Sequence, residues 1–170
     1  MTAAALALPP VTGAQSEGDV PRASVAPVLS GRYKFVLTVS RGCPAAMQAT
    51  PLTVVMDVTE ATITQGSEVS GHSASPSEVP DDGLFVLLRQ GDRLHGAFGS
   101  GEALGLVTSE GYLLWLRIMT DGTATSATGG RSRASGTAFG EVDLGLASKP
   151  SAESINCKDA LEHQWTLEPT

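Results

Sequence analysis

The chain has 170 residues and a formal net charge of −7; 41% of its residues are hydrophobic and only 17% are charged. Nucleic acids and anionic membrane surfaces are bound by clustered Lys and Arg, and here the 11 basic residues are scattered, which argues against both as partners. Little charge together with 19 glycines and abundant Thr, Ser and Ala is typical of short strands joined by tight turns rather than of amphipathic helices.

The first residues indicate processing rather than folding. Residues 1–14 hold a short apolar run and a plausible cleavage site but no basic start, so they are interpreted as a truncated export signal or else a modest apolar tail. Residues 15–30 are polar and proline-bearing, which is typical of a flexible linker. No run reaches the roughly 18 apolar residues that span a bilayer. We therefore expect one domain, residues 31–169, in a secreted or periplasmic protein without a membrane span.

Two clear strands open this domain. Tyr33, Phe35, Leu37 and Val39 alternate with more polar residues, and the stretch from Leu52 to Val58 repeats the pattern. A period of two with aromatic and β-branched residues predicts half-buried strands. Residues 65–83 hold almost no large apolar side chain, so they are expected to form a polar loop that is a lid or disordered, with a short strand at 68–73 as an alternative.

Glycine-containing pairs then recur along the chain: Gly91-Asp92, Glu110-Gly111, Asp121-Gly122, Gly129-Gly130 and Gly140-Glu141. Such pairs between short apolar runs favour two-residue hairpin turns, and their regular recurrence predicts an antiparallel meander. The glycine-rich stretch 123–140 lacks the lysine and the following helix of a phosphate-binding loop. Its Arg131 and Arg133 are interpreted as part of a solvated strand face.

The remaining segments complete the meander. Tyr112–Met119 is apolar on both faces apart from Arg117, which predicts a strand covered on both sides, by the core and by a neighbouring element or a second copy of the chain. Residues 151–163 favour one short helix. In the closing strand, Leu161, His163, Trp165 and Leu167 are expected to point inward.

About nine to eleven short strands in one meander predict an all-β fold, an antiparallel up-and-down barrel, because closure removes exposed strand edges. Cys43 and Cys157 form no C-x-x-C motif, and they follow the first strand and precede the last. We expect them to form one disulfide at the seam where these strands pair. Two buried thiols in a cytosolic protein are the alternative.

The order of elements resembles the lipocalin (calycin) group of small β-barrels. The resemblance depends on Gly31-Arg32-Tyr33 at the start of the first strand, where the family has Gly-x-Trp, on the early polar loop, and on the run of hairpins with a disulfide to the C-terminal region. It implies a small apolar molecule as ligand, without assigning any residue to its binding.

No catalytic motif is present. Phe98–Glu102 lacks the spacing of a nucleophile elbow, and the three histidines form no zinc-binding pair, so we expect no cofactor, no metal and no catalytic residue. His72 is interpreted as solvated, His95 as pointing outward, and His163 as a hydrogen-bonded core residue. The neighbouring carboxylates Glu141 and Asp143 are interpreted as a solvated face.

Three functions remain. The first is a binding module that holds a small apolar ligand inside the barrel, because eight-stranded barrels have room for one. The residues expected to line that site are Tyr33, Phe35, Phe85, Phe98, Trp115, Phe139, His163 and Trp165. The second is a scaffold with a filled core that acts through its outer face, including self-association through Tyr112–Met119. The third is an enzyme, which would need the polar loop to bring His72 and Asp81 or Asp82 over the barrel mouth.

Overall fold

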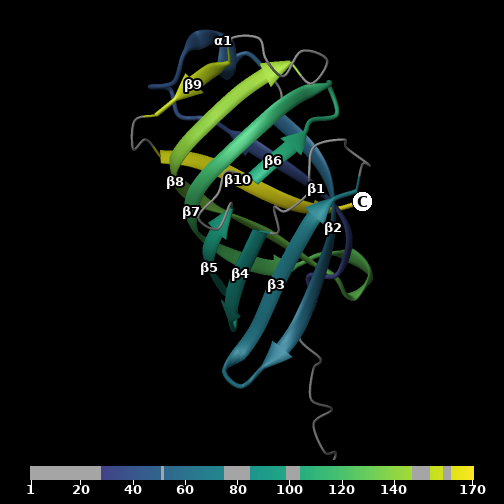
Figure 1. Ribbon diagram of the computed structural model, residues 1–170. Coiled ribbons are helices and arrows are strands. Elements are labelled where there is room, and N and C mark those ends of the chain that lie inside the picture. The colour runs from purple at the N-terminus through teal and green to yellow at the C-terminus, as the bar shows by residue number, and fades with distance from the viewer. Residues whose placement is uncertain (1–27, 51, 75–84, 99–103, 147–153, 159–161) are drawn as a thin grey trace, which may run out of the picture.

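The structure of the protein is a computed structural model that describes residues 28–50, 52–74, 85–98, 104–146, 154–158 and 162–170. These residues form ten strands and two short helical segments (Figure 1). In chain order the elements are β1 (Gly31–Thr38), α1 (Ala45–Gln48), β2 (Leu52–Ile63), β3 (Gly66–Ser73), β4 (Phe85–Gln90), β5 (Arg93–Phe98), β6 (Leu104–Val107), β7 (Tyr112–Ser126), η1 (Thr128–Gly130), β8 (Ser132–Leu146), β9 (Ile155–Cys157) and β10 (Glu162–Pro169).

The strands form one antiparallel sheet that closes on itself. β1, β2, β3, β4 and β5 pair with one another in that order, and β5 pairs in turn with β7. β7 pairs with β8 over its whole length, and β10 pairs with β1. β5 and β6 lie end to end beside β7, and β9 and β10 lie end to end beside β8, so the ten strands occupy eight positions around the barrel. The predicted closed up-and-down barrel, including the pairing of the first and last strands, is confirmed.

Alternation of buried and exposed residues explains how these strands build the core. Tyr33, Phe35 and Leu37 of β1 point inward, as do Leu52 to Val58 of β2 at every second position. In β10 the inward residues are His163, Trp165 and Leu167, as expected, while Leu161 lies outside the described residues. Burying one face of each strand against the others removes apolar surface from water, the main favourable term in folding.

Three of the predicted turns are confirmed by backbone conformation. Gly91, Gly111 and the pair Gly129-Gly130 have φ values of 65°, 83°, 72° and 74°, which glycine adopts without a steric penalty. The turns predicted at Asp121-Gly122 and Gly140-Glu141 are wrong, because β7 and β8 run through both positions. Gly122 and Gly136 face each other across the two strands, and a Cβ on Gly122 would lie 2.6 Å from the Trp165 ring. The glycine at 122 therefore makes room for a core side chain.

The short helix lies elsewhere than expected. It is α1, directly after β1, whereas the described part of the C-terminal segment forms strand β9, which pairs with Val142–Leu144 of β8. Strand pairing outweighs the weak local preference for a helix there. Among the described residues, the structure has no helix of the length and apolar character needed to cross a membrane.

The predicted disulfide between Cys43 and Cys157 is present, with a Cα–Cα distance of 5.3 Å. It joins the segment between β1 and α1 to the end of β9. Both half-cystines belong to the hydrophobic core. The bond thus ties the short strand β9 to the N-terminal part of the barrel.

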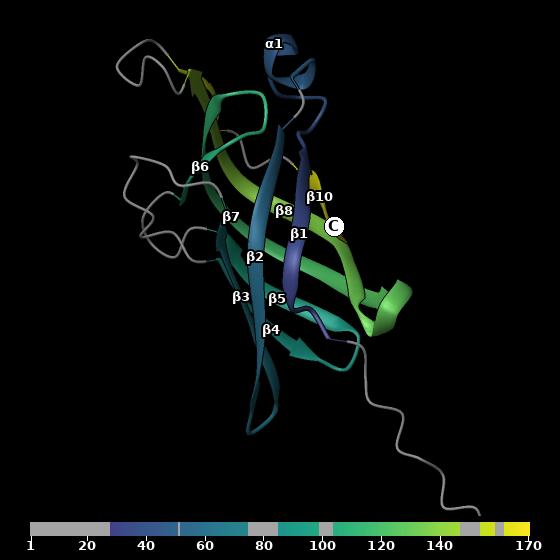
Figure 2. The same ribbon diagram turned by 90° about the vertical axis from the view of Figure 1, so that its right-hand side faces the viewer.

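The chain itself covers both ends of the barrel. α1 lies at the end to which β1 runs (Figure 2). Its Met47 is fully buried in the core. At the opposite end, before β1 begins, Leu29 is also fully buried in the core, and Val28 forms an isolated bridge with Arg131. Residues 28–30, assigned to the linker from their composition, therefore pack as part of the barrel, while residues 1–27 lie outside the described residues.

Candidate functional site

The barrel interior holds six of the eight residues expected to line a ligand site. They are fully or almost fully buried: Tyr33, Phe35, Phe85, Phe98, His163 and Trp165. The Phe98 ring lies at the centre of a cluster, with ring centroids 5.0 Å from Phe35, 5.0 Å from Phe85 and 5.7 Å from Trp165. Such separations are those of packed aromatic pairs. These rings pack against one another in the middle of the barrel.

Trp115 and Phe139 lie on the outer face instead. Inward positions of β7 are taken by Leu114, Leu116 and Ile118, so Trp115 between them points outward, where it is half-buried over Gly105 of β6. Phe139 is 47% exposed on β8. The sequence does not indicate which face of the sheet Trp115 is on, because both faces of Tyr112–Met119 are apolar. The coverage predicted for the outer face of this strand is present only in part, since the outward Leu113 is buried while the outward Met119 is 54% exposed.

His163 has both ring nitrogens engaged inside the barrel. Its Nδ1 accepts a hydrogen bond from the backbone N–H of Ser40 at 3.1 Å, which places the proton on Nε2. Nε2 lies 3.2 Å from the carbonyl oxygen of Gly140 and donates to it. A neutral imidazole has one donor and one acceptor, and here both are used. The side chain is thus the hydrogen-bonded core residue that the sequence predicted.

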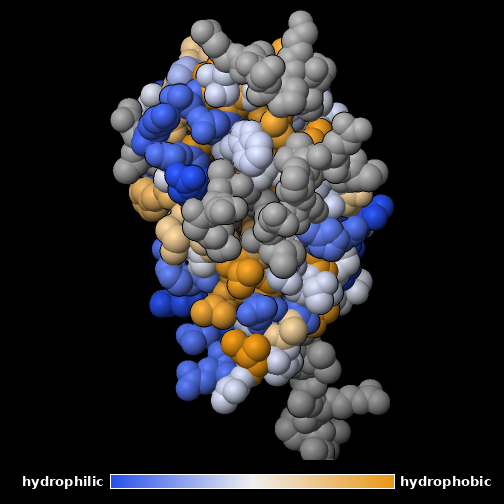
Figure 3. Space-filling view, viewed as in Figure 1, coloured by the Kyte–Doolittle hydropathy of each residue, from blue (hydrophilic) through white to orange (hydrophobic). Residues whose placement is uncertain are grey.

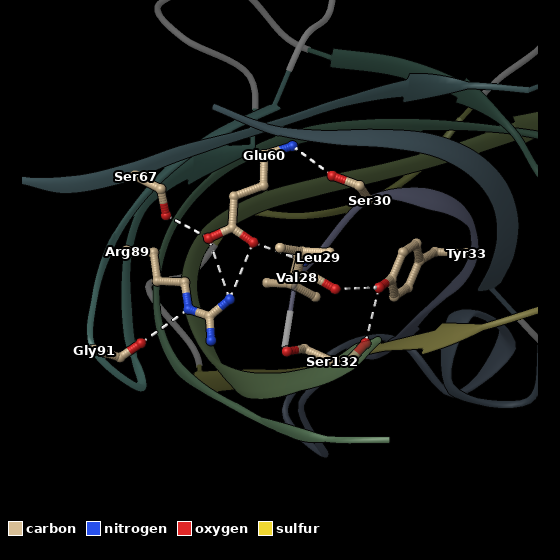
Figure 4. Close-up of polar contacts among 9 residues, drawn as sticks. All are labelled: Val28, Leu29, Ser30, Tyr33, Glu60, Ser67, Arg89, Gly91 and Ser132. Carbon is tan, nitrogen blue, oxygen red and sulfur yellow. Dashed lines mark hydrogen bonds and ion pairs between the residues drawn. The ribbon is translucent and has the colours of Figure 1, made fainter. Parts of the chain in front are cut away.

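A buried polar cluster lies at the end of the barrel closed by Leu29 (Figure 4). The Glu60 carboxylate accepts hydrogen bonds from the Leu29 N–H at 2.6 Å and from the Ser67 hydroxyl, and it pairs with Arg89 at 3.0 Å. The Glu60 and Arg89 side chains are each only 9% exposed, and Arg89 Nε also donates to the carbonyl of Gly91 at 2.9 Å. Buried charges must be paired, and Glu60 and Arg89 pair with each other. Through its bond to the Leu29 N–H, Glu60 also holds the residue 28–30 segment in the barrel end.

Sequence reasoning missed this cluster, although a signal was present. Glu60 continues the inward alternation of Leu52 to Val58, and Arg89 continues that of Phe85 and Leu87. Opposite charges at the inward ends of two apolar alternations indicate a buried ion pair.

Tyr33 lies beside the same end. Its hydroxyl donates to the carbonyl of Ser132 at 2.8 Å, and the Arg131 guanidinium lies 4.6 Å from the ring centre. Burial raises the pKa of the Tyr33 phenol above its usual range, and the Arg131 charge opposes this only in part.

This pKa shift predicts a loss of stability in alkali. The folded state holds the Tyr33 proton more tightly than the unfolded chain, so the linked stability is complete below the unfolded pKa of about 10 and falls as the pH rises through the folded pKa. We expect Tyr33→Phe to lower the free energy of unfolding by about 1 kcal/mol at neutral pH and to reduce its decline above about pH 10. Urea unfolding at both pH values measures this. An equal alkaline decline in the variant would contradict it.

The remaining titratable groups form no second centre among the described residues. His72 is exposed on β3, and Asp81 and Asp82 lie outside the described residues, so the enzyme hypothesis stays a prediction. Glu141 pairs with Arg117 at 3.5 Å, and burial raises the pKa of the neighbouring Asp143. Within the described part of the chain, no three His, Cys, Asp or Glu side chains gather to hold a metal ion.

The outer face of the barrel carries a hollow of about 690 Å³ over β4, β5, β7 and β8. It is lined mainly by outward side chains, among them Leu88, His95, Asp121 and Thr137, with Gly122 and Gly136 in its wall. His95 Nδ1 lies 2.6 Å from an Asp121 carboxylate oxygen, and these side chains are 64% and 73% exposed. His95 thus points outward, as expected, and lies in a hollow that the sequence did not predict.

A second hollow of about 350 Å³ lies over β8, β10 and β1. Ser135, Gly136 and Thr137 line both hollows, so the two adjoin each other, and together they are here called the outer groove. The groove follows a row of side chains that lie directly opposite one another from strand to strand: Leu88, His95, Asp121, Thr137, Gln164 and Thr38. With neighbouring strands about 4.8 Å apart, this row of six strands spans roughly 24 Å.

A small apolar area borders the outer groove. Met119 and Phe139 are direct partners on β7 and β8, each two residues from a groove side chain on the same face, and they are 54% and 47% exposed. Leu88, 47% exposed, lies in the groove itself. Figure 3 shows hydrophobic residues reaching the surface in the lower middle of its face, while hydrophilic residues gather along its left side. The outer face therefore offers polar and apolar contacts side by side.

The fold and this surface define a small, disulfide-linked, up-and-down β-barrel with a groove across its outer face. No family model, curated protein or solved structure matches the chain. Of the resemblance to lipocalins, the closed antiparallel barrel is confirmed.

Proposed function

We propose that the protein is an exported binding module that acts through the outer groove. The observation that carries this proposal is the contrast between the two faces of the sheet. Inside, packed aromatic rings occupy the middle of the barrel, and Leu29 and Met47 are buried at its two ends. Outside, two adjoining hollows are lined mainly by exposed and half-buried side chains. Binding sites are concave surfaces that combine apolar area with a few well-placed polar groups.

Export is supported by the disulfide. Such bonds persist in oxidising compartments and are rare in the cytosol. The signal-like composition of residues 1–14 agrees with a secreted or periplasmic location. The lipocalin resemblance implies a small apolar ligand inside the barrel, and that site, lined by Phe35, Phe98 and their neighbours, stays a prediction that the following experiment also tests.

A fragment screen by NMR distinguishes the two locations. We expect saturable shifts of backbone amide signals around Asp121, Thr137 and Gln164, which line the groove. Ser135→Arg places a large side chain in the part shared by both hollows and is expected to abolish these shifts. Thr59→Arg, on the exposed outer face of β2, adds the same charge outside the groove and is the matched control. Shifts confined to Phe35, Phe85 and Phe98 would instead place the site in the barrel and overturn the proposal.

A further inference from the structure

We propose that the outer groove binds a neutral oligosaccharide. This inference rests on the proposed function, because it names the class of ligand for the same groove. It depends on three observations: the chemistry of the lining side chains, the length of the groove, and the apolar area at its border.

The lining side chains are mostly uncharged hydrogen-bonding groups. Beside the row that defines the groove, a second row runs directly opposite from strand to strand: Gln90, Arg93, Thr123, Ser135, Thr166 and Val36. Of the twelve side chains in the two rows, five are Ser or Thr hydroxyls and two are Gln amides, all of which line the groove. Hydroxyl and amide groups both donate and accept, as sugar hydroxyls do. Asp121 adds a carboxylate that accepts from hydroxyl groups.

The same chemistry weighs against other ligands. A wholly apolar molecule would leave these polar groups without partners, which is costly. A polyanion would need clustered cations, whereas the groove holds Arg93 and His95 beside Asp121, in a protein of net charge −7. A peptide binds a sheet most readily by pairing with a free edge, but the groove crosses the faces of strands that are already paired on both sides.

Length and the apolar border fit an oligosaccharide. The groove crosses six strands, a path of roughly 24 Å along the curved wall of the barrel, so a chain of several sugar rings that bends with the wall has room along it. Phe139 and Met119 flank it on the side of Thr137 and Asp121. The face of an aromatic ring is electron-rich and attracts the C–H groups on the apolar face of a sugar ring. Hydroxyls along the groove and an exposed ring at its edge together match both sides of a pyranose.

The test uses the full chain on a glycan array that carries neutral, sialylated and sulphated glycans, followed by calorimetric titration of the best-bound neutral oligosaccharide. We expect binding to neutral glycans that changes little between low and high salt, because charge pairing contributes little to it. Asp121→Asn removes the charge and one acceptor oxygen, and Thr137→Val removes a hydroxyl, in both cases without adding bulk. Each is expected to weaken binding about five- to tenfold. Phe139→Ala is expected to weaken it to a similar extent.

Two matched controls keep the result specific. Thr59→Val removes an exposed hydroxyl from β2, outside the groove, and Leu146→Ala truncates an apolar side chain on β8 that is as exposed as Phe139. Both are expected to bind like the parent protein. Thermal unfolding and near-ultraviolet circular dichroism confirm that every variant is folded. Because each substituted side chain is exposed or half-buried, we expect all of these variants to fold.

Each other outcome overturns the inference. Binding to acidic glycans alone, no binding to any neutral glycan, or neutral binding that Asp121→Asn and Thr137→Val leave unchanged would each do so. A parallel array of peptides covers the remaining class of polymer, and peptide binding that these variants abolish would replace the oligosaccharide. If fragments bind in the groove but no glycan does, the proposed function stands and only this inference fails.

Discussion

Glu60→Gln is expected to lower the free energy of unfolding by about 3–5 kcal/mol, because it removes the carboxylate charge that pairs with the buried Arg89 guanidinium at 3.0 Å. The amide keeps the size of the side chain, so the effect reports charge rather than packing. The Leu29 N–H and the Ser67 hydroxyl also lose a carboxylate acceptor. Urea unfolding followed by tryptophan fluorescence measures the change.

Two further variants separate this cause from others. Glu60→Leu combined with Arg89→Leu removes both charges and is expected to be less destabilising than Glu60→Gln, since neither charge of the pair then has to be buried. Asp57→Asn breaks the Arg32–Asp57 pair, whose side chains are 59% and 39% exposed, and is expected to change stability little. Equal effects of Glu60→Gln and Asp57→Asn would show that the buried pair does not stabilise this end of the barrel.

Replacing both cysteines by serine is expected to lower the free energy of unfolding by roughly 4–5 kcal/mol, the chain-entropy value for a loop of about 100 residues or more. The Cys43–Cys157 bond closes a loop with a sequence separation of 114. The loss of this constraint allows the unfolded chain many more conformations. Within the folded state, β9 also loses its covalent tie to the first part of the barrel, so hydrogen exchange should quicken there first.

Denaturant unfolding of the parent protein with and without a reductant provides the control. Reduction should lower the stability of the parent to that of the double-serine variant and leave the variant itself unchanged. An unfolding midpoint of the parent that is insensitive to reduction would contradict the prediction. It would mean that the pairing of β9 with Val142–Leu144 and of β10 with β1 holds the seam without the bond.

The packed aromatic cluster inside the barrel changes where function is sought. In an eight-stranded barrel the interior is just wide enough for side chains to fill it or for one small ligand. Here Phe98 contacts Phe35, Phe85 and Trp165, and His163 spends both ring nitrogens on backbone groups. The two hollows of the outer groove are lined mainly by the outward-facing residues of the same strands. We expect these residues to contact a partner.

The candidate site shows how far sequence reasoning reached. The inward placement of Tyr33, Phe35, His163 and Trp165 follows from a period of two, which a strand imposes on its side chains. Trp115 was misplaced because Tyr112–Met119 of β7 bears apolar residues on both faces, so neighbouring residues do not reveal which face is buried. For Phe139 a signal was present, because it shares its face of β8 with Arg133, Glu141 and Asp143.

The outer groove had no signal in the sequence. Its residues come from six strands, and each is separated from the next by many residues in the chain. Which side chains lie opposite one another depends on the register of every pairing around the barrel. A shift of one residue in a single strand would turn its outward residues to the core.

Four features could be predicted from the sequence: the all-β class, the hairpin turns at Gly91, Gly111 and Gly129-Gly130, closure into a barrel, and the disulfide. Alternation and positive-φ glycines act locally, and the need to remove strand edges acts on the chain as a whole. The tertiary structure was needed to show that β7 and β8 run straight through Gly122 and Gly140. The space beside Gly122 is taken by Trp165 from another strand. The tertiary structure alone brought Glu60 to Arg89 and aligned the groove, because both depend on contacts between residues far apart in the chain.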